Sequence, residues 1–114
     1  WIWVHAQGAE SVDDLVFAAE KGAWIEFDGV SEVNAESHLE LVNSMKSRGL
    51  LNRVLLSHDG NSYNAVGKGL PKGYDALLTT FVPLLESNGY SEQEIRQLIR
   101  GNPQEAFTVG IREA

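Results

Sequence analysis

Three short apolar segments, each followed by a stretch with helical periodicity, constrain the fold of this chain more than any other feature. The segments are 1–5, 23–28 and 53–58. Strands that alternate with helices of about 10 to 15 residues predict βαβ units and a parallel sheet. The three units span ~90 residues, whereas a complete (β/α)8 barrel needs ~250. The 114 residues therefore predict one α/β domain over 1–114, with no separate second domain.

The helices are predicted from apolar residues at helical spacing and from residues that begin or end helices. Ser11 is a suitable N-cap for the first helix, which Gly22 ends. A second helix is expected over 35–48. A third is expected over 74–87, where Pro83 predicts a kink.

The last segment opens with a capping box, Ser-Glu-Gln-Glu, at 91–94. The run Gly-Asn-Pro at 101–103 predicts a break in the helix that follows. Pro103 then suits the first turn of a short final helix, which holds Ala106 and Phe107.

An ionisable residue stands at the end of each predicted strand. His5 follows the first, Asp28 the second, and His58 and Asp59 the third. In a (β/α)8 barrel the carboxyl ends of the strands converge on the active-site face. Imidazole and carboxylate groups are also the ligands that a divalent cation takes when no thiolate is present. The pattern favours a metal site that activates water.

A purely structural interpretation of the same residues stays open at this point. A single His or Asp at a strand end is more often a turn residue or a helix cap than a ligand. Asp28, for example, can accept backbone N–H groups in the turn that it forms with Gly29. Periodicity alone does not decide between the two interpretations.

Composition narrows the class of protein. With 43% hydrophobic and 22% charged residues the chain is globular, and no apolar run is long enough to span a bilayer. The net charge of -7 argues against a nucleic-acid-binding surface. The chain has no cysteines, which excludes thiolate metal sites and cysteine nucleophiles and fits a reducing, cytoplasmic compartment. Because it opens with Trp-Ile-Trp-Val and no Met, we expect a piece of a longer protein.

Four stretches together resemble the phosphotriesterase-like branch of the amidohydrolase superfamily. They are 21–28 (Lys-Gly-Ala-Trp-Ile-Glu-Phe-Asp), 53–59 (Arg-Val-Leu-Leu-Ser-His-Asp), 74–81, and 91–107 with its Asn-Pro before Ala-Phe. They occur in order, with family-like spacing, along nearly the whole chain. The resemblance implies that the chain is the C-terminal part of a (β/α)8 TIM barrel, with strands six, seven and eight and their helices.

The resemblance also implies roles for the strand-end residues. His5 falls on a ligand of the more exposed of two divalent metals, expected to be zinc. Asp59 falls on a ligand of the buried metal and is the catalytic proton acceptor. Asp28 matches an acidic position near the substrate pocket and is expected to bind substrate. Gly8 and Gly29 stand where the best-known phosphotriesterases carry an acid and a histidine of a proton relay, which argues against efficient organophosphate hydrolysis.

Several other residues carry weaker expectations. Glu26 should share a strand face with Trp24 and make a structural polar contact. His58 is expected to pack or bond locally, and His38 to be solvated between two glutamates. The three tryptophans are expected in the core, and the loop 60–73 is either a substrate-facing lid or a mobile surface loop. 

We therefore predict part of a metal-dependent hydrolase that cleaves an ester, lactone or phosphoester. The other ligands of the family site would lie before Trp1, so the chain alone is expected to be inactive. It should need the missing barrel half as a partner, or self-associate as a homo-oligomer. The alternative is a barrel relative that acts as a binding or structural protein. A phosphate-binding isomerase or aldolase ranks lowest, because no Gly-rich phosphate loop follows the last strands.

Overall fold

The computed structural model describes residues 1–60 and 73–110. Three parallel strands lie in the order β1-β2-β3: β1 (Ile2–Trp3), β2 (Trp24–Phe27) and β3 (Val54–Leu56). Trp3 pairs with Ile25, and Phe27 pairs with Leu56. The predicted strands and their parallel pairing are confirmed, although each strand is shorter than its apolar segment.

The two faces of the sheet differ because successive side chains of a strand point to opposite sides. Ile25 and Phe27 are fully buried in the main hydrophobic cluster, together with Val54 of β3. Trp24 lies outside that cluster, and Glu26 is half-buried on the same side of β2 as Trp24. One face of the sheet therefore packs against helices, and the other carries the residues that would face a barrel interior.

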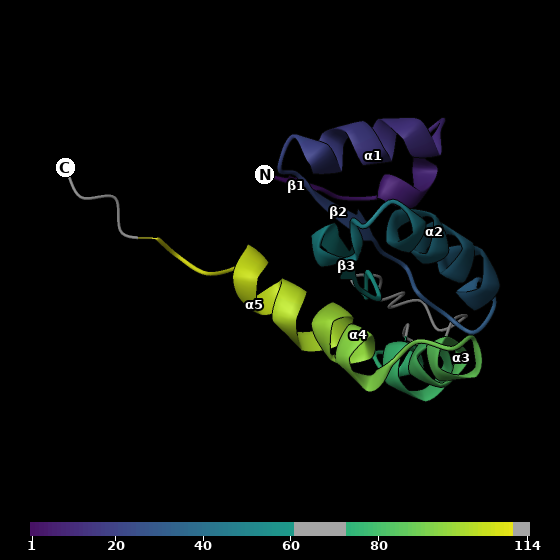
Figure 1. Ribbon diagram of the computed structural model, residues 1–114. Coiled ribbons are helices and arrows are strands. Elements are labelled where there is room, and N and C mark those ends of the chain that lie inside the picture. The colour runs from purple at the N-terminus through teal and green to yellow at the C-terminus, as the bar shows by residue number, and fades with distance from the viewer. Residues whose placement is uncertain (61–72, 111–114) are drawn as a thin grey trace, which may run out of the picture.

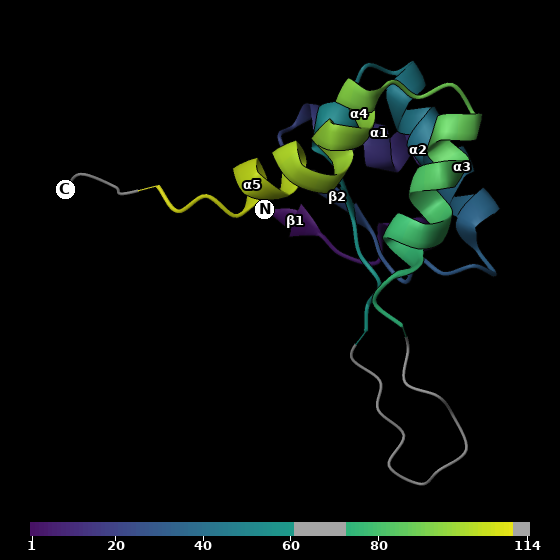
Figure 2. The same ribbon diagram turned by 90° about the horizontal axis from the view of Figure 1, so that it is seen from below.

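The described residues form five α-helices, of which α1 and α2 each connect two strands and the other three follow β3. In Figure 2 the helices α1 to α4 lie on one side of the strands, and Figure 1 shows α1 and α2 against the sheet with α3 to α5 running along it. Their bounds are α1 (Val12–Glu20), α2 (Ala35–Ser47), α3 (Val82–Ser87), α4 (Glu92–Arg96) and α5 (Asn102–Ala106). Two 3-10 turns, η1 (Ala6–Gly8) and η2 (Leu51–Arg53), flank the strands. None of the helices in the described part of the chain is long and apolar enough to cross a membrane.

The predicted helix starts are confirmed at α1 and α4. The Ser11 hydroxyl accepts hydrogen bonds from the backbone N–H groups of Asp13 and Asp14. Ser91 and Glu94 form the reciprocal bonds of a capping box. These side chains satisfy N–H groups that have no partner within the helix, which is why the sequence fixes the starts so well.

Two prolines are accommodated by π turns. The turns η3 (Leu77–Phe81) and η4 (Gln97–Gly101) each end two residues before a proline, Pro83 or Pro103. In both, the residue just before the proline donates its N–H to the carbonyl five residues earlier. The predicted break at 101–103 is wrong. Gly101 and Asn102 keep helical backbone angles, because the wider turn absorbs the proline ring without ending the helix.

The amino end of β3 is anchored by Asn102. Asn102 is 2% exposed, and its side-chain amide donates to the carbonyl oxygens of Leu51 (2.8 Å) and Val54 (2.7 Å). Both carbonyls lie where the backbone enters the strand. The start of α5 is therefore tied to the end of the strand opposite the predicted site.

Two sequence expectations about burial are wrong, and one falls outside the described residues. Trp24 is buried and Trp3 packs against the core, but Trp1 is 81% exposed because it precedes β1, an edge strand of the described sheet. His38 is 4% exposed rather than solvated, since it lies on the inner face of α2. The loop predicted over 60–73 lies almost wholly outside the residues that the structure describes.

Candidate metal centre

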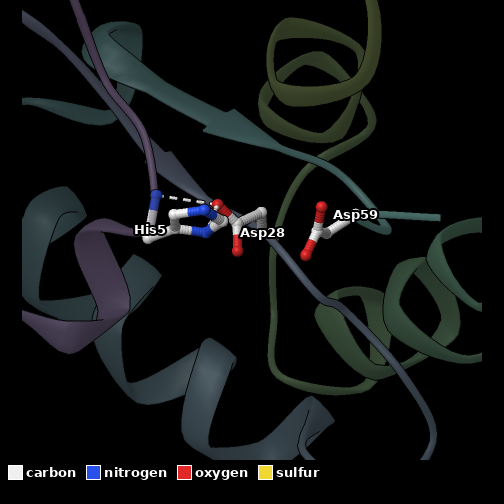
Figure 3. Close-up of side chains that lie close together, drawn as sticks. All are labelled: His5, Asp28 and Asp59. Atoms are coloured by element: carbon white, nitrogen blue, oxygen red, sulfur yellow. Dashed lines mark hydrogen bonds and ion pairs between the residues drawn. The ribbon is translucent and has the colours of Figure 1, made fainter. Parts of the chain in front are cut away.

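The carboxyl ends of the three strands bring one ionisable side chain each to a common edge of the sheet. His5 follows β1, Asp28 follows β2 and Asp59 lies beyond β3. One candidate ligand atom from each of the three residues lies within 4.8 Å of the others. Figure 3 shows the side chains converging from three separate strand ends. The structure thus brings together all three residues that the sequence singled out.

The backbone at two of these positions is unusual. His5 (φ 55°) and Asp59 (φ 46°) have left-handed backbone conformations, and no other non-glycine residue in 1–60 and 73–110 has a positive φ. An L-residue pays on the order of 1 kcal/mol for this conformation. Such strain persists where the surrounding structure imposes it, and it concentrates at functional sites. Both predicted ligand positions carry it.

Asp28 holds the His5 side chain in place. One carboxylate oxygen, Oδ2, accepts the backbone N–H of His5 at 2.7 Å and lies 2.7 Å from the ring nitrogen Nδ1. The imidazole is nevertheless 67% exposed, whereas the Asp28 side chain is 6% exposed. A carboxylate on Nδ1 leaves Nε2 as the ring nitrogen that can bind a metal.

Asp28 remains ionised despite its burial. Burial opposes the charged form, but hydrogen bonds from Gln7 and His5 stabilise it more strongly, so the pKa of Asp28 is lowered. The opposite shift occurs on its partner. The pKa of His5 is raised, because Asp28 accepts a hydrogen bond from the ring and attracts its positive charge, with smaller contributions from Asp59 and Glu26. The centre therefore has the negative potential that attracts a cation.

Asp59 approaches the pair from the third strand end. It is half-buried and turned toward His5 and Asp28 in Figure 3. Its neighbour His58 points elsewhere: Nε2 of His58 accepts the backbone N–H of Leu77 at 2.9 Å, and its ring contacts Tyr74 edge-on. The predicted local role of His58 is confirmed.

Sequence reasoning missed two residues that support Asp28. The Gln7 side chain makes two hydrogen bonds with Asp28. The His38 ring lies between two backbone carbonyl oxygens, with Nε2 2.8 Å from that of Asp28 and Nδ1 3.1 Å from that of Asn34. A signal existed for His38, since it stands three residues after Ala35 and four before Val42 on the buried stripe of α2. The sequence offered no comparable signal for Gln7.

The two glycines that depart from the best-known phosphotriesterases lie beside the centre. Gly8 ends the 3-10 turn after His5, and Gly29 follows Asp28 with φ +69°. A Cβ atom at either position would meet nothing within 4 Å. Space is thus available at Gly8, whereas Gly29 is also favoured by its left-handed backbone.

Comparison with known proteins identifies the family. The sequence profile of the phosphotriesterase family matches residues 2–107. The chain belongs to this family. It is 31% identical over 106 residues to the phosphotriesterase homology protein of Escherichia coli (strain K12), an alignment that covers 90% of this chain and 36% of that protein.

Solved structures agree with this assignment. The Escherichia coli phosphotriesterase homology protein, complexed with phosphate in its active site, superposes with a TM-score of 0.72 at 31% identity, covering 85% of this chain and 34% of that one. The phosphotriesterase from Mycobacterium tuberculosis superposes with a TM-score of 0.76 at 21% identity, covering 93% and 36%. The organophosphorus hydrolase from Deinococcus radiodurans gives 0.73 at 22% identity, covering 91% and 36%.

The chain spans about a third of the length of these phosphotriesterase-family relatives. The predicted resemblance is confirmed, and so is the fold class: three parallel βα units that form the C-terminal part of a TIM barrel. The matches below 25% identity support the fold alone.

Proposed function

We propose that this chain forms part of a metal-dependent hydrolase and supplies His5 and Asp59 as ligands of a divalent metal centre. The observation that carries the proposal is the convergence of His5, Asp28 and Asp59 at the strand ends, with ligand atoms within 4.8 Å of one another. The left-handed backbone at both proposed ligands supports it.

The donor set fits a hard or borderline divalent cation. It consists of imidazole nitrogen and carboxylate oxygen with no thiolate, and the exposed His5 ring gives a metal access. Zinc is the ion that we propose. When bound, such a cation polarises a substrate oxygen and acidifies water.

His5, Asp59 and Asp28 would then have different roles. His5 presents Nε2, because Asp28 engages Nδ1 and the backbone N–H of the same residue. Asp59 would bind the metal through its carboxylate and accept a proton from water, as the family resemblance implies. Both oxygens of Asp28 are already used by His5 and Gln7. We therefore assign Asp28 to orienting His5 rather than to the substrate binding expected from the sequence.

The proposed substrate is an ester, lactone or phosphoester. The Escherichia coli relative holds phosphate in its active site, which favours a site for a tetrahedral oxyanion. Gly8 and Gly29 leave out the polar side chains of the proton relay described above, so we place phosphotriesters below carboxylic esters and lactones. The remaining barrel strands would complete the ligand set and pair with the edge strands β1 and β3.

Metal binding by the 114-residue chain tests the first half of the proposal. Calorimetric titration with Zn²⁺ or Co²⁺ should show one bound ion per chain, whose affinity is weakened by H5A and D59N. The exposed Glu86 on α3 provides a matched control, since E86Q removes a carboxylate charge far from the centre in sequence. Absence of metal binding would refute the ligand assignment, and two tight ions per chain would refute the need for further ligands.

Hydrolysis tests the second half and requires the polypeptide with the rest of the barrel. A panel of a phosphotriester, a δ-lactone and a p-nitrophenyl ester should show metal-dependent turnover that D59N abolishes. A metal-binding protein that turns over none of them would instead favour the binding role, as in the fold relative from Rhodobacter sphaeroides that is described as a resiniferatoxin-binding protein.

A further inference from the structure

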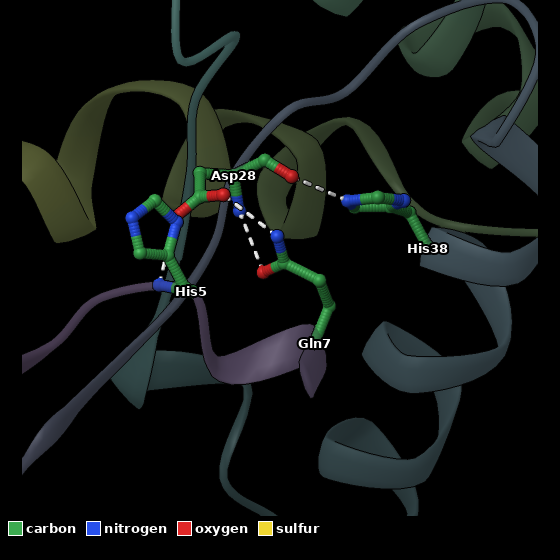
Figure 4. Close-up of polar contacts among 4 residues, drawn as sticks. All are labelled: His5, Gln7, Asp28 and His38. Atoms are coloured by element: carbon green, nitrogen blue, oxygen red, sulfur yellow. Dashed lines mark hydrogen bonds and ion pairs between the residues drawn. The ribbon is translucent and has the colours of Figure 1, made fainter. Parts of the chain in front are cut away.

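Gln7 forms a two-point contact with Asp28 across the neighbouring strand ends. Its Nε2 donates to Asp28 Oδ1 at 2.6 Å, and its Oε1 accepts the Asp28 backbone N–H at 3.2 Å (Figure 4). This pairing fixes the orientation of the Gln7 amide. In the flipped amide, Oε1 would face the carboxylate oxygen of Asp28, and Nε2 would face its backbone N–H.

Every polar group of Asp28 has a named partner. Gln7 bonds to the backbone N–H and to Oδ1 of Asp28. Both the backbone N–H and the ring Nδ1 of His5 contact Oδ2, and the His38 ring lies at the carbonyl oxygen. Because Gln7 holds both the backbone and one carboxylate oxygen, it fixes the rotamer of Asp28. The second oxygen is thereby directed at His5.

The contact between Gln7 and Asp28 completes a closed set of contacts with His5. His5 and Gln7 lie two residues apart at the turn η1, and both bind the same carboxylate, one through each oxygen. Rotation of Asp28 away from Gln7 would carry Oδ2 away from the His5 ring as well. The orientation of the His5 ring thus depends on Gln7 through the carboxylate of Asp28.

We propose that Gln7 is a positioning residue of the metal centre: through Asp28 it holds the His5 imidazole with Nδ1–H on Oδ2 and Nε2 directed outward. The positioning role rests on the proposed metal-binding function, whereas the contacts of Gln7 with Asp28 and of Asp28 with His5 do not depend on it. A purely structural Gln7 would serve only to satisfy the polar groups of Asp28.

The state of the His5 ring can be read directly without metal. The chain has three histidines, so ¹⁵N–¹H correlation spectra of the labelled 114-residue chain resolve each ring. In the unmodified chain, neutral His5 should be protonated on Nδ1. His58 is an internal reference, because its Nε2 accepts the Leu77 N–H. In Q7A, His5 should shift to a mixture of the two tautomers while His58 is unchanged.

Co²⁺ titration gives the functional consequence. Q7A should weaken binding about 10-fold, in the range found for residues that orient metal ligands. Q7E should weaken it at least as much, since a carboxylate oxygen would then face Asp28 Oδ1 across 2.6 Å. Gln93 on α4 is exposed, and the matched variants Q93A and Q93E should change neither readout.

The outcomes separate the two proposals. If the unmodified chain binds no Co²⁺, the proposed function fails, and the tautomer of His5 in Q7A still decides the role of Gln7. An unchanged His5 tautomer in both Q7A and Q7E would overturn the inference. So would a loss of affinity that follows a loss of folded protein in circular dichroism, because Gln7 would then be structural only.

Discussion

The polar residues at the two ends of the strands differ in exposure and in backbone strain. At the carboxyl ends, His5 is 67% exposed and, like Asp59, sits on a strained backbone. At the amino end of β3, Asn102 is 2% exposed, and its amide satisfies two backbone carbonyls. In TIM barrels the carboxyl-end face carries catalysis and the amino-end face carries stability. We propose the same division for this chain, so variants at the carboxyl ends should change metal affinity and variants at the amino end should change stability.

The sharpest test of the stability end is N102A. It removes two buried hydrogen bonds: the carbonyl oxygen of Val54 loses its side-chain donor, and that of Leu51 keeps only the Val54 N–H. The loss should cost about 3 kcal/mol of unfolding free energy. Urea denaturation followed by tryptophan fluorescence measures this cost. Metal affinity of the protein that remains folded should not change. Equal losses of stability and affinity would break the proposed division.

The complementary test at the site end is H5A. Removal of this proposed ligand should weaken Co²⁺ binding by more than about 100-fold, beyond the usual effect of an orienting residue. The unfolding free energy should stay within about 0.5 kcal/mol, as for a surface substitution. Titration and denaturation of the same preparation provide both values. A loss of several kcal/mol would show that His5 stabilises the fold.

His38 is buried like Asn102 but contacts Asp28 of the proposed site, so H38A should affect both stability and metal affinity. The variant leaves the Asp28 carbonyl without its ring partner in a residue that is 4% exposed. We expect a cost of about 2 kcal/mol in stability, together with a smaller loss of metal affinity than in H5A. Its exposed neighbour Ser37 provides the control S37A. Unchanged affinity would place His38 wholly with the structural residues.

The smallest expected effect is a pH dependence far from the site. Lys46 and the Ser91 backbone stabilise the charged form of Glu94, so the pKa of Glu94 is lowered in the folded state. Its contribution is present above the unfolded-state value near 4.5 and is lost as pH falls through the lowered folded-state value. E94Q should therefore cost about 0.5 kcal/mol at neutral pH and nothing near ~pH 2.

Denaturation of E94Q and its parent at both pH values checks this sign. The exposed Glu105 on α5 offers the control E105Q. A larger deficit in acid than at neutral pH would contradict the assignment of Glu94 to the Lys46 pair.

Local patterns in the sequence predicted most of the fold. Strand and helix order, the Ser11 cap and the Ser91 capping box follow from periodicity and from N–H groups that need an acceptor. The continuous helix through Gly101 and Asn102 could not be predicted in this way. A proline near glycine signals a break by local rules, whereas the structure accommodates Pro103 in a π turn, as it does Pro83.

Only part of the candidate site could be predicted from the sequence. His5, Asp28 and Asp59 could be singled out because parallel strands place their carboxyl ends together. The contact between Gln7 and Asp28 depends on side-chain rotamers across 21 positions of sequence. The burial of His38 could not be predicted from its neighbours Glu36 and Glu40, which favour an exposed position, whereas its place on the apolar stripe of α2 buries it.

The left-handed backbone at His5 and Asp59 also bears on how such a sequence drifts in evolution. Glycine adopts this conformation without a steric cost, so a glycine at either position would relax the backbone and remove a proposed ligand. On the proposed function, the two side chains are kept at this backbone cost because they bind the metal. A relative with glycine at both positions should have a less strained backbone there and should lack the proposed metal centre.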